Sequence, residues 1–482
     1  MNPHSRTPNA PDRSGAATGP GPRSVRGALA GLSLSVLLPS LGTSVVPVGL
    51  PALAGAFDTS FRAVQWIVLA YLLALTTLVV GAGRLGDLLG RRRLLLGGTA
   101  LFTTASLLCG AAPTLWLLIV ARAAQGFGAA VMTALAMTFV AETVPKDRTG
   151  SAMGLLGTAS AVGTALGPSL GGFLISGSGW QAIFLVSVPP GLLVLFLAHR
   201  HLPADRPRPE PDRPGFDRPG TLLLVLALAA YALAMTLGRG FGPVNAALLL
   251  AAVCGAALFV RVETRAASPL IRLSAFRDPA LSASLVTSAL VSTVMMTTLV
   301  VGPFYLARGL GLEQALVGLV LAAGPVVAAL TGVPAGRVVD RFGAGRTTLA
   351  GLAAMAAGAT ALSVPGNPGV FGYVAPLVVV TAGYAVFQTA NNTAVMADVP
   401  PDRRGVVSGV LNLSRNLGLV TGASVMGAVF ALATASADIA TADAASVAAG
   451  TRITYAVAAG VTVVALAVAA GGRALARSAR RA

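Results

Sequence analysis

The sequence contains fourteen long apolar runs separated by short polar turns, and this pattern limits the possible folds more than any other feature. Apolar residues make up 55% of the chain and charged residues only 11%, whereas ordinary soluble domains carry about 25% charged residues. A helix needs about 20 mainly apolar residues to cross a bilayer. The pattern therefore predicts an all-α integral membrane protein. The predicted spans are residues 28–50, 62–82, 94–112, 114–140, 150–174, 181–198, 220–238, 243–260, 280–304, 314–335, 347–364, 371–395, 405–431 and 453–471.

A charged turn after the second run is nearly repeated 253 residues later. The first copy, residues 83–93, reads GRLGDLLGRRR, and the second, residues 336–346, reads GRVVDRFGAGR. A second pair of turns, VPKDRTG at 144–150 and VPPDRRG at 399–405, has an offset of 255. Two pairs at nearly equal offset favour an internal duplication over a chance resemblance between short turns. Spans 1–6 and 9–14 are thus predicted to be equivalent six-helix bundles, and duplicated bundles place a substrate site at their seam.

The duplication and the composition of the loops divide the chain into seven predicted segments. The polar, proline-rich ends and linkers predict extended or disordered backbone. The segments are a disordered cytoplasmic tail (1–27), an N-terminal six-helix bundle (28–199), a Pro/Arg-rich linker (200–219), two inserted transmembrane helices (220–262), a cytoplasmic loop (263–279), a C-terminal six-helix bundle (280–472) and a basic tail (473–482).

The net charge of +17 does not indicate a nucleic-acid partner, because the basic residues lie in short turns rather than on one face. If the N-terminus is cytoplasmic, the inner tails and loops hold 28 of the 34 Lys and Arg residues, and the outer loops hold four. Positive residues concentrate on the cytoplasmic side of membrane proteins. We therefore predict a bacterial plasma (inner) membrane protein with both termini in the cytoplasm. Both cysteines, Cys109 and Cys254, lie in apolar runs, which argues against a disulfide framework.

Three motifs, in order on successive spans, resemble those of the major facilitator superfamily, specifically its fourteen-span drug–proton antiporter branch. They are the turn at 83–93, the segment RAAQGFGAA at 122–130 in span 4, and the glycine series of span 5 that begins at Gly154. The resemblance covers about residues 28–471. It implies two six-helix bundles in a pseudo-two-fold arrangement plus two extra helices, fourteen transmembrane helices in all.

The resemblance also implies a role for each motif, and each role has a plainer alternative. The turn implies a conformational latch between the halves; its alternative is a basic anchor with a capping carboxylate. The span 4 motif implies proton relay; its alternative is a structural arginine bonded to backbone carbonyls. The span 5 motif implies a seal on the outer side; its alternative is ordinary close helix packing. The residues are Gly83, Arg84, Asp87, Gly90, Arg91 and Arg92 for the latch, Arg122, Gln125, Gly126 and Glu142 for the relay, and Gly154, Gly163, Gly167, Pro168, Gly171 and Gly172 for the seal.

The chain departs from the family pattern in span 1, where many relatives carry an aspartate and this sequence has Gly42. In the predicted topology no acidic residue or histidine lies at mid-membrane depth, so a proton carrier is expected at the inner rim, at Asp87 or Glu142. A site with buried arginines and no carboxylate should favour neutral or anionic substrates over lipophilic cations. Polar and aromatic residues inside the spans are the candidate substrate-binding residues: Gln65, Tyr71, Tyr305, Tyr384, Gln388, Asn391 and Arg415.

Taken together, these features predict a secondary active efflux transporter for drugs, antibiotics or similar amphiphilic molecules, which works by proton antiport and alternating access. The alternative is an exporter of an endogenous metabolite on the same scaffold, with or without proton coupling. A membrane-embedded enzyme is disfavoured because no acid–base pair or metal cluster lies in the predicted spans, and a passive channel would need rings of pore-lining charge. The expected partners are a small-molecule substrate, protons and membrane lipid. A monomer without cofactor or metal is expected.

Overall fold

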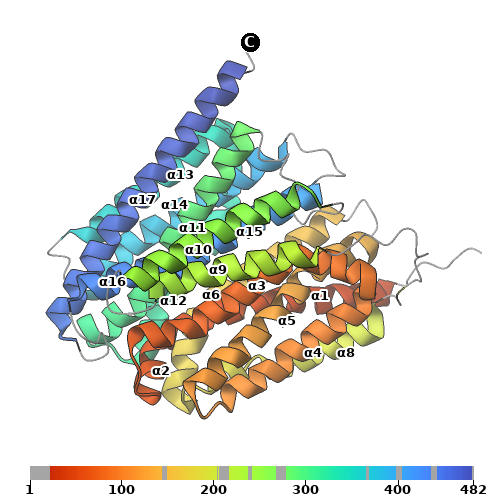
Figure 1. Ribbon diagram of the computed structural model, residues 1–482, viewed down its shortest axis with the longest axis horizontal. Helices are drawn as coiled ribbons and strands as arrows, with labels where there is room; N and C mark the ends of the chain where they lie inside the picture. The colour runs from red at the N-terminus through yellow and green to blue at the C-terminus, as the bar shows by residue number, and fades with distance from the viewer. Residues whose placement is uncertain are drawn as a thin grey trace, which may run out of the picture.

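The computed structural model is entirely helical over the residues that it describes, which are 22–143, 149–202, 205, 217–236, 242–266, 278–364, 369–397, 404–435 and 442–479. Figure 1 shows the helices running side by side in two groups, with the chain passing from the red and orange group to the blue group. The first group comprises α1 (Pro22–Val48), α2 (Leu50–Ala56), α3 (Phe61–Leu89), α4 (Arg91–Gly110), α5 (Leu115–Thr143), α6 (Thr149–Ser178), α7 (Ala182–Leu185) and α8 (Val188–His201).

Two helices then separate this group from the second one. They are α9 (Arg218–Thr236) and α10 (Pro243–Glu263), and they form an antiparallel pair. The second group comprises α11 (Pro279–Phe304), the π-helical turn η4 (Tyr305–Gly309), α12 (Gln314–Phe342), α13 (Ala344–Ser363), α14 (Gly369–Ala397), α15 (Arg404–Thr421), the π-helical turn η5 (Gly422–Met426), α16 (Gly427–Ala433) and α17 (Ala444–Ala479).

The two groups pack their helices in the same pattern. In the first group α1 packs on α6, α3 on α5, α4 on α5, and α8 on α1 and α4. In the second group α11 packs on α15, α12 on α14, α13 on α14, and α17 on α11 and α13. Each group therefore repeats one arrangement of helices, which is the behaviour of a duplicated bundle.

Glycines at equivalent positions bring the paired helices into backbone contact. A Cβ at Gly163 of α6 would collide with the carbonyl oxygen of Leu37 in α1, and a Cβ at Gly418 of α15 would collide with that of Ala289 in α11. Small residues permit this approach, and van der Waals contact drives helix association in a bilayer. Hydroxyl groups reinforce both seams, because Ser44 Oγ donates to the Gly163 carbonyl at 3.3 Å and Thr293 Oγ1 donates to the Gly418 carbonyl at 3.0 Å.

The tight turns after α3 and α12 define one end of the molecule, which we call the basic end; the other is the opposite end. The turn residues are Gly90, with φ of 94°, and Gly343, with φ of 80°. Glycine suits both positions because this left-handed region is unfavourable for residues that carry a Cβ. The segments that contain these turns, 83–93 and 336–346, both have arginine at their second and last positions, which gives this end its charge.

Twelve helices in the described part of the chain are long and apolar enough to cross a membrane, so the predicted count of fourteen is not supported. Two predicted spans, those of α9 and α13, do not meet this requirement of length and hydropathy, for different reasons. The apolar part of α9, Pro219–Ala234, is shorter than 18 residues, and at 1.5 Å per residue it does not cover a hydrocarbon core of about 30 Å. The helix α13 is long enough, but its alanine, glycine and threonine residues and Arg346 lower its hydropathy.

We expect alanine at either seam glycine, Gly163→Ala or Gly418→Ala, to lower the unfolding temperature of the detergent-solubilised protein. The added methyl group would meet a backbone oxygen, which cannot move aside without shifting a helix, and such overpacking costs about 1–3 kcal/mol. Gly97→Ala is the matched control, because a Cβ at this exposed position in α4 has nothing within 4 Å. Equal unfolding temperatures for the three variants would contradict this account of the seams.

Candidate functional site

The most buried charge among the described residues is Arg122, in the first third of α5, and its side chain is 1% exposed. Its guanidinium donates three hydrogen bonds: Nε to the Ile67 carbonyl at 3.0 Å, Nη2 to the Gly42 carbonyl at 3.2 Å, and Nη1 to Gln125 Oε1. Among the described residues, no carboxylate bonds to it. A charge inside a membrane domain is costly and marks a functional-site candidate, and here neutral oxygens from three helices stabilise it.

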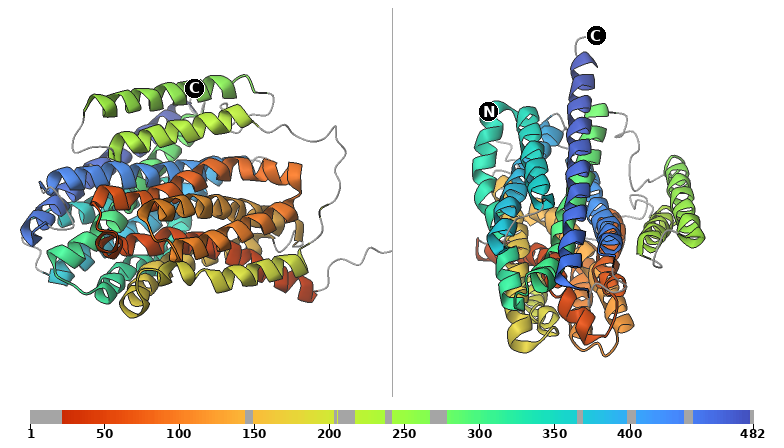
Figure 2. Two further views of the ribbon diagram at one scale, coloured as in Figure 1. Left: turned by 60° about the horizontal axis from the view of Figure 1, so that its bottom comes forward. Right: turned by 90° about the vertical axis from the view of Figure 1, so that its left-hand side faces the viewer.

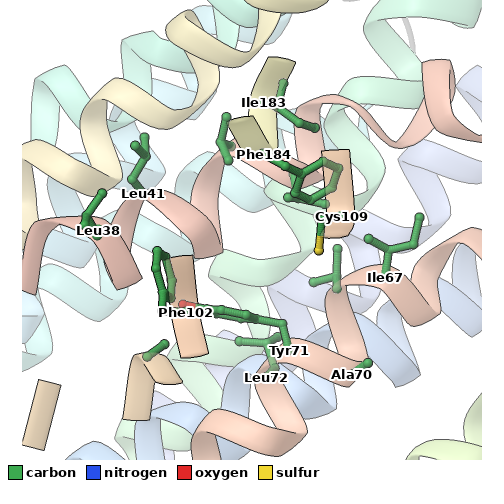
Figure 3. Close-up of a cluster of buried hydrophobic side chains, with 14 of the residues drawn as sticks. Leu38, Leu41, Ile67, Ala70, Tyr71, Leu72, Phe102, Cys109, Ile183 and Phe184 are labelled. Carbon is green, nitrogen blue, oxygen red and sulfur yellow. The ribbon is translucent and has the colours of Figure 1, made fainter. Parts of the chain in front are cut away.

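Aromatic rings complete the surroundings of Arg122. The Tyr71 ring lies with its centroid 4.1 Å from the guanidinium carbon, and the Phe184 ring lies 5.9 Å away, both within range for a cation–π interaction. The Tyr71 hydroxyl donates to the Pro39 carbonyl of α1 at 2.9 Å. Figure 3 shows the buried side chains of this part of the molecule, with Ile67 and Tyr71 on α3, Cys109 on α4 and Phe184 on α7. The site thus lies where α1, α3, α4, α5 and α7 meet.

Residues near Arg122 in sequence hold its helix in place. A Cβ at Gly126, one turn further along α5, would collide with the Tyr71 carbonyl oxygen, so glycine is what allows α5 and α3 to touch here. Gln125 holds the other side, since its Nε2 donates to Ser106 Oγ of α4 at 2.7 Å. The sequence Arg-x-x-Gln-Gly therefore links α5 to α3 and α4 while presenting its guanidinium to α1.

At the opposite end, the two groups of helices meet through uncharged contacts. Gln65 Nε2 of α3 donates to the Ala423 carbonyl of η5 at 3.2 Å, and Gln314 Nε2 of α12 donates to the Val48 carbonyl at the end of α1. A Cβ at Gly172 of α6 would lie 2.7 Å from the Gln314 carbonyl oxygen and 2.8 Å from the Gly318 Cα, so α6 and α12 touch here.

An aromatic cluster adds apolar burial to this contact. Phe61 of α3 packs edge-on against Phe304 of α11 and Phe430 of α16, with ring centroids 4.7 and 5.5 Å apart. All three side chains are at most 2% exposed. The opposite end is therefore closed, by two hydrogen bonds and a buried aromatic cluster, with no ion pair among the residues that form these contacts.

At the basic end, each charged turn is bonded to the last helix of its own group. Arg92 Nη2 donates to the His199 carbonyl at the end of α8, and Arg473 of α17 donates to the Gly345 carbonyl in the second turn. Asp205, in the segment after α8, accepts the backbone N–H groups of Arg92 at 2.8 Å and Arg93 at 3.1 Å, and so caps α4. These bonds hold each turn within its own half.

The structure brings only part of the predicted site together. Arg122, Gln125, Gly126 and Tyr71 form the buried cluster. The seal residues Gly163, Gly167 and Gly171 face α1, whereas Pro168 and Gly172 contact α12. Gln65 lies in the closure at the opposite end, and Tyr305 stacks near Tyr373 with centroids 5.5 Å apart. Tyr384, Gln388 and Arg415 are half-buried and Asn391 is buried, in α14 and α15.

Several predicted residues lie outside the part that the structure describes in side-chain detail. They are Gly83, Arg84, Asp87, Glu142 and Gly154, whose helices are described but whose side-chain surroundings are not. The latch and the proton carriers at the inner rim therefore stay predictions.

Three residues that matter to this geometry were not among the predicted site residues. Asp205 lies in a proline-rich linker, and its capping role depends on a helix more than 100 residues earlier. Gln314 begins α12, and the acceptor at Ala423 lies in a π-helical turn that no pattern in the sequence marked. A polar residue at the predicted outer end of a span was the only available signal for Gln314.

Comparison with known proteins gives a consistent picture. A family model described as Major Facilitator Superfamily matches residues 32–423. The chain is 32% identical over 408 residues to the multidrug resistance protein Stp of Mycobacterium tuberculosis, covering 83% of this chain and 74% of that protein. It is 33% identical over 408 residues to the multidrug efflux pump LfrA of Mycolicibacterium smegmatis, covering 84% and 80% of the two chains. It is also 27% identical over 401 residues to the riboflavin transporter RibZ of Clostridioides difficile, covering 83% and 87%.

Among solved structures, a bacterial homologue of the human lysosomal transporter Spinster superposes with a TM-score of 0.69 at 17% identity, covering 94% of this chain and 97% of that one. The xylose transporter XylE from E. coli superposes with a TM-score of 0.61 at 14% identity, covering 92% and 96%. These similarities establish the fold.

We expect Gln125→Ala to destabilise the protein more than the same change at a matched glutamine. The substitution leaves an Arg122 N–H and the Ser106 hydroxyl without their partners in a buried place, which costs about 1–3 kcal/mol. Gln388→Ala is the control, since Gln388 is half-buried in α14 and makes no side-chain hydrogen bond with a described residue. Thermal unfolding in detergent measures both, and equal losses would show that the Arg122 cluster is not a stabilising network.

We expect Gln65→Leu to open the closure at the opposite end. Loss of one neutral hydrogen bond, worth about 1 kcal/mol, should raise the ratio of open to closed molecules about fivefold. Spin labels at Gly55→Cys and Glu313→Cys, in a Cys254→Ser background, report the separation of the two halves by pulsed electron resonance. Gln388→Leu is the control. An unchanged distance distribution in Gln65→Leu would mean that this bond does not hold the halves together.

Proposed function

Because the chain belongs to the major facilitator superfamily of transporters, we propose that it is a secondary active exporter of drug-like amphiphilic molecules that exchanges substrate for protons by alternating access. Two features support this proposal. Relatives that match most of the chain are multidrug resistance and efflux proteins. The two helical groups repeat one packing pattern and are joined at the opposite end by uncharged contacts.

One observation carries the proposed substrate class: the buried charge of Arg122 is stabilised by carbonyl groups and aromatic rings, with no carboxylate bonded to it among the described residues. A lipophilic cation that approaches this region would meet a like charge in a medium of low dielectric constant. Neutral and anionic substrates avoid this repulsion. The second arginine inside a span, Arg415 of α15, is half-buried and would add to the same preference.

The geometry at Gly42 strengthens this inference. Its carbonyl oxygen accepts from Arg122 at 3.2 Å, at the position where the span 1 aspartate of many relatives would stand. A Cβ added to Gly42 would lie 3.4 Å from the Tyr71 hydroxyl, an ordinary contact, so a side chain can begin here without a collision. We infer that a backbone dipole replaces an acid here, and that the proton is carried elsewhere, at Asp87 or Glu142.

The placement in the membrane follows from charge. We propose that the basic end faces the cytoplasm of a bacterial cell with both termini on that side, because Lys and Arg concentrate at this end. We also propose that α9 and α13 cross the membrane with the twelve clearly apolar helices. The helix α13 packs between α14 and α17, and α9 packs along α10 and α3. Each of these neighbours is longer than the helix that it flanks. A monomer is sufficient for this arrangement.

A second candidate function is export of an endogenous metabolite, with or without proton coupling. The similarity to a riboflavin transporter favours it, because that relative covers nearly as much of this chain as the drug-resistance proteins do. Growth of a deletion strain with toxic compounds separates the two candidates, since loss of a metabolite exporter would leave the sensitivity of that strain unchanged.

We expect proteoliposomes containing the protein to transport chloramphenicol (neutral) or novobiocin (anionic) but not ethidium (cationic), and to change their lumenal pH when substrate moves. Substrate movement without a pH change would exclude antiport. Export of ethidium by the unmodified protein would contradict the electrostatic argument. We expect Gly42→Asp, which places a carboxylate beside Arg122, to strengthen ethidium binding about fivefold, the equivalent of about 1 kcal/mol, and so to make ethidium transport detectable. Gly97→Asp, on the exposed face of α4, controls for an added charge alone.

A further inference from the structure

The π-helical turn η5 interrupts the helix formed by α15 and α16 where that helix reaches the opposite end. A π-turn holds one residue more than an α-helical turn, is rare, and often marks a functional site. At the 255-residue offset of the duplication, the matching segment of the first half is 167–171 in α6, which is α-helical and has Pro168 in the place of Ala423. Proline also disturbs a helix, since it has no N–H to donate. Both halves thus depart from regular winding at the same position.

Both of these positions present a backbone carbonyl to the other half. A Cβ at Gly318 of α12 would lie 2.5 Å from the Pro168 carbonyl oxygen, and the Ala423 carbonyl accepts from Gln65 Nε2 of α3 at 3.2 Å. The end of the π-turn also lies against the Gln65 side chain, because a Cβ at Gly427 would collide with its amide nitrogen. The winding of η5 therefore decides whether Gln65 has its acceptor.

One side chain of η5 is poorly accommodated in the π-turn. Ser424 Oγ is fully buried and makes no hydrogen bond with a described residue. In the α-helical segment just before it, Thr421 Oγ1 donates to the Leu417 carbonyl, four residues earlier, at 2.8 Å. Helical serine and threonine hydroxyls commonly form this bond. Regular α-helical winding would offer Ser424 the same bond, to the Val420 carbonyl.

The two windings of this segment satisfy different groups. In the π-turn the Ala423 carbonyl bonds to Gln65, and the Ser424 hydroxyl has no partner among the described residues. An α-helix would satisfy Ser424 and return the Ala423 carbonyl to the ladder of backbone bonds. A buried hydroxyl without a partner and a neutral hydrogen bond have free energies of the same order. A small change can therefore decide which winding the segment adopts.

The helix α16 carries the second part of the closure. It has only seven residues and ends at Ala433. Phe430 of α16 packs edge-on against Phe61 of the first half, with ring centroids 5.5 Å apart. Absorbing the extra residue of η5 into an α-helix would turn α16 by about 100° and advance it by about 1.5 Å relative to α15. This rotation would remove the Phe430 ring from the aromatic cluster.

We propose that η5 is the switch that opens the opposite end. The π-turn keeps the two halves together, and its conversion to an α-helix breaks the Gln65 bond and withdraws Phe430 in a single rearrangement. This inference rests on the alternating access of the proposed function. Rigid rocking of the halves alone would instead leave α16 in its place within the second half.

The inserted pair shelters this switch. It lies on one side of the bundle (Figure 2), and α9 packs on both α3 and η5. Irregular backbone at membrane depth is tolerated only where protein or water covers it. Together with α3 and α11, which also pack on η5, the pair keeps the π-turn away from lipid. The backbone of η5 can then change its winding without exposing polar groups to hydrocarbon.

Spin labels placed within the second half test the switch directly. Leu432→Cys on α16 and Phe371→Cys on α14 are exposed positions, and both belong to the second half. The background is Gln65→Leu, which favours the open form, with Cys254→Ser. We expect pulsed electron resonance to show a second population displaced by at least about 5 Å, because a turn of about 100° carries the label to another face of α16.

A second pair of labels reports the opening between the halves in the same background. Gly55→Cys and Glu313→Cys lie at the opposite end, one in each half. If this distance lengthens while the distance between α14 and α16 stays unchanged, the switch is overturned and alternating access stands. If both pairs show a single closed population, the switch is overturned together with the opening that the proposed function requires.

Ser424→Ala tests the switch through its energy. Removal of the hydroxyl relieves the π-turn and takes away the bond that an α-helix would form, so we expect the open fraction to fall at least about fivefold in the Gln65→Leu background. Ser35→Ala is the matched control, because Ser35 is fully buried in α1 and donates to the Gly31 carbonyl at 2.8 Å. Equal open fractions in the two variants overturn the proposal.

Discussion

Close contact between helix backbones is the constraint on which the rest of this structure depends. In a bilayer the hydrophobic effect does not drive one apolar helix against another, so association depends on van der Waals contact and interhelical hydrogen bonds. Glycines provide that contact at the seams inside each half, at Gly163 and Gly418, and between the halves at Gly172 and Gly318. The same residue type therefore performs two tasks: it fixes the helices within each bundle and forms a separable contact between the bundles.

The cluster around Arg122 depends on the same closeness. A guanidinium can be stabilised by backbone carbonyls of neighbouring helices only if those backbones come near, and Gly126 removes the side chain that would keep α5 away from α3. Three neutral acceptors and two aromatic rings then take the place of a counter-ion. The positive charge of Arg122 stays in the interior without an acid bonded to it among the described residues, and the proposed preference for neutral or anionic substrates rests on this.

The sequence was sufficient for the fold class and the family, because hydropathy, the repeated turn and the glycine spacing are all local patterns. The predicted count of spans is not supported at two helices: α9 is short in its described apolar part, and α13 contains many small and polar residues. The partners of Gln65, Gln314 and Asp205 were beyond prediction, since each bond joins segments more than 100 residues apart. A π-helical turn, which places the Ala423 carbonyl within reach of Gln65, has no signature in composition.

The inserted helices show how an addition can change a duplicated fold without altering its symmetric core. The paired seams α1–α6 and α11–α15 have the same glycine and hydroxyl contacts, so the insertion leaves the internal packing of each half alone. What it changes is the environment of the seams between the halves. Because α9 and α10 pack against helices of both halves, any motion that separates α3 from α15 must either carry the pair along with one half or break its apolar cluster. The inserted pair places no such constraint on the α6–α12 seam, where helices of the two halves pack directly on each other.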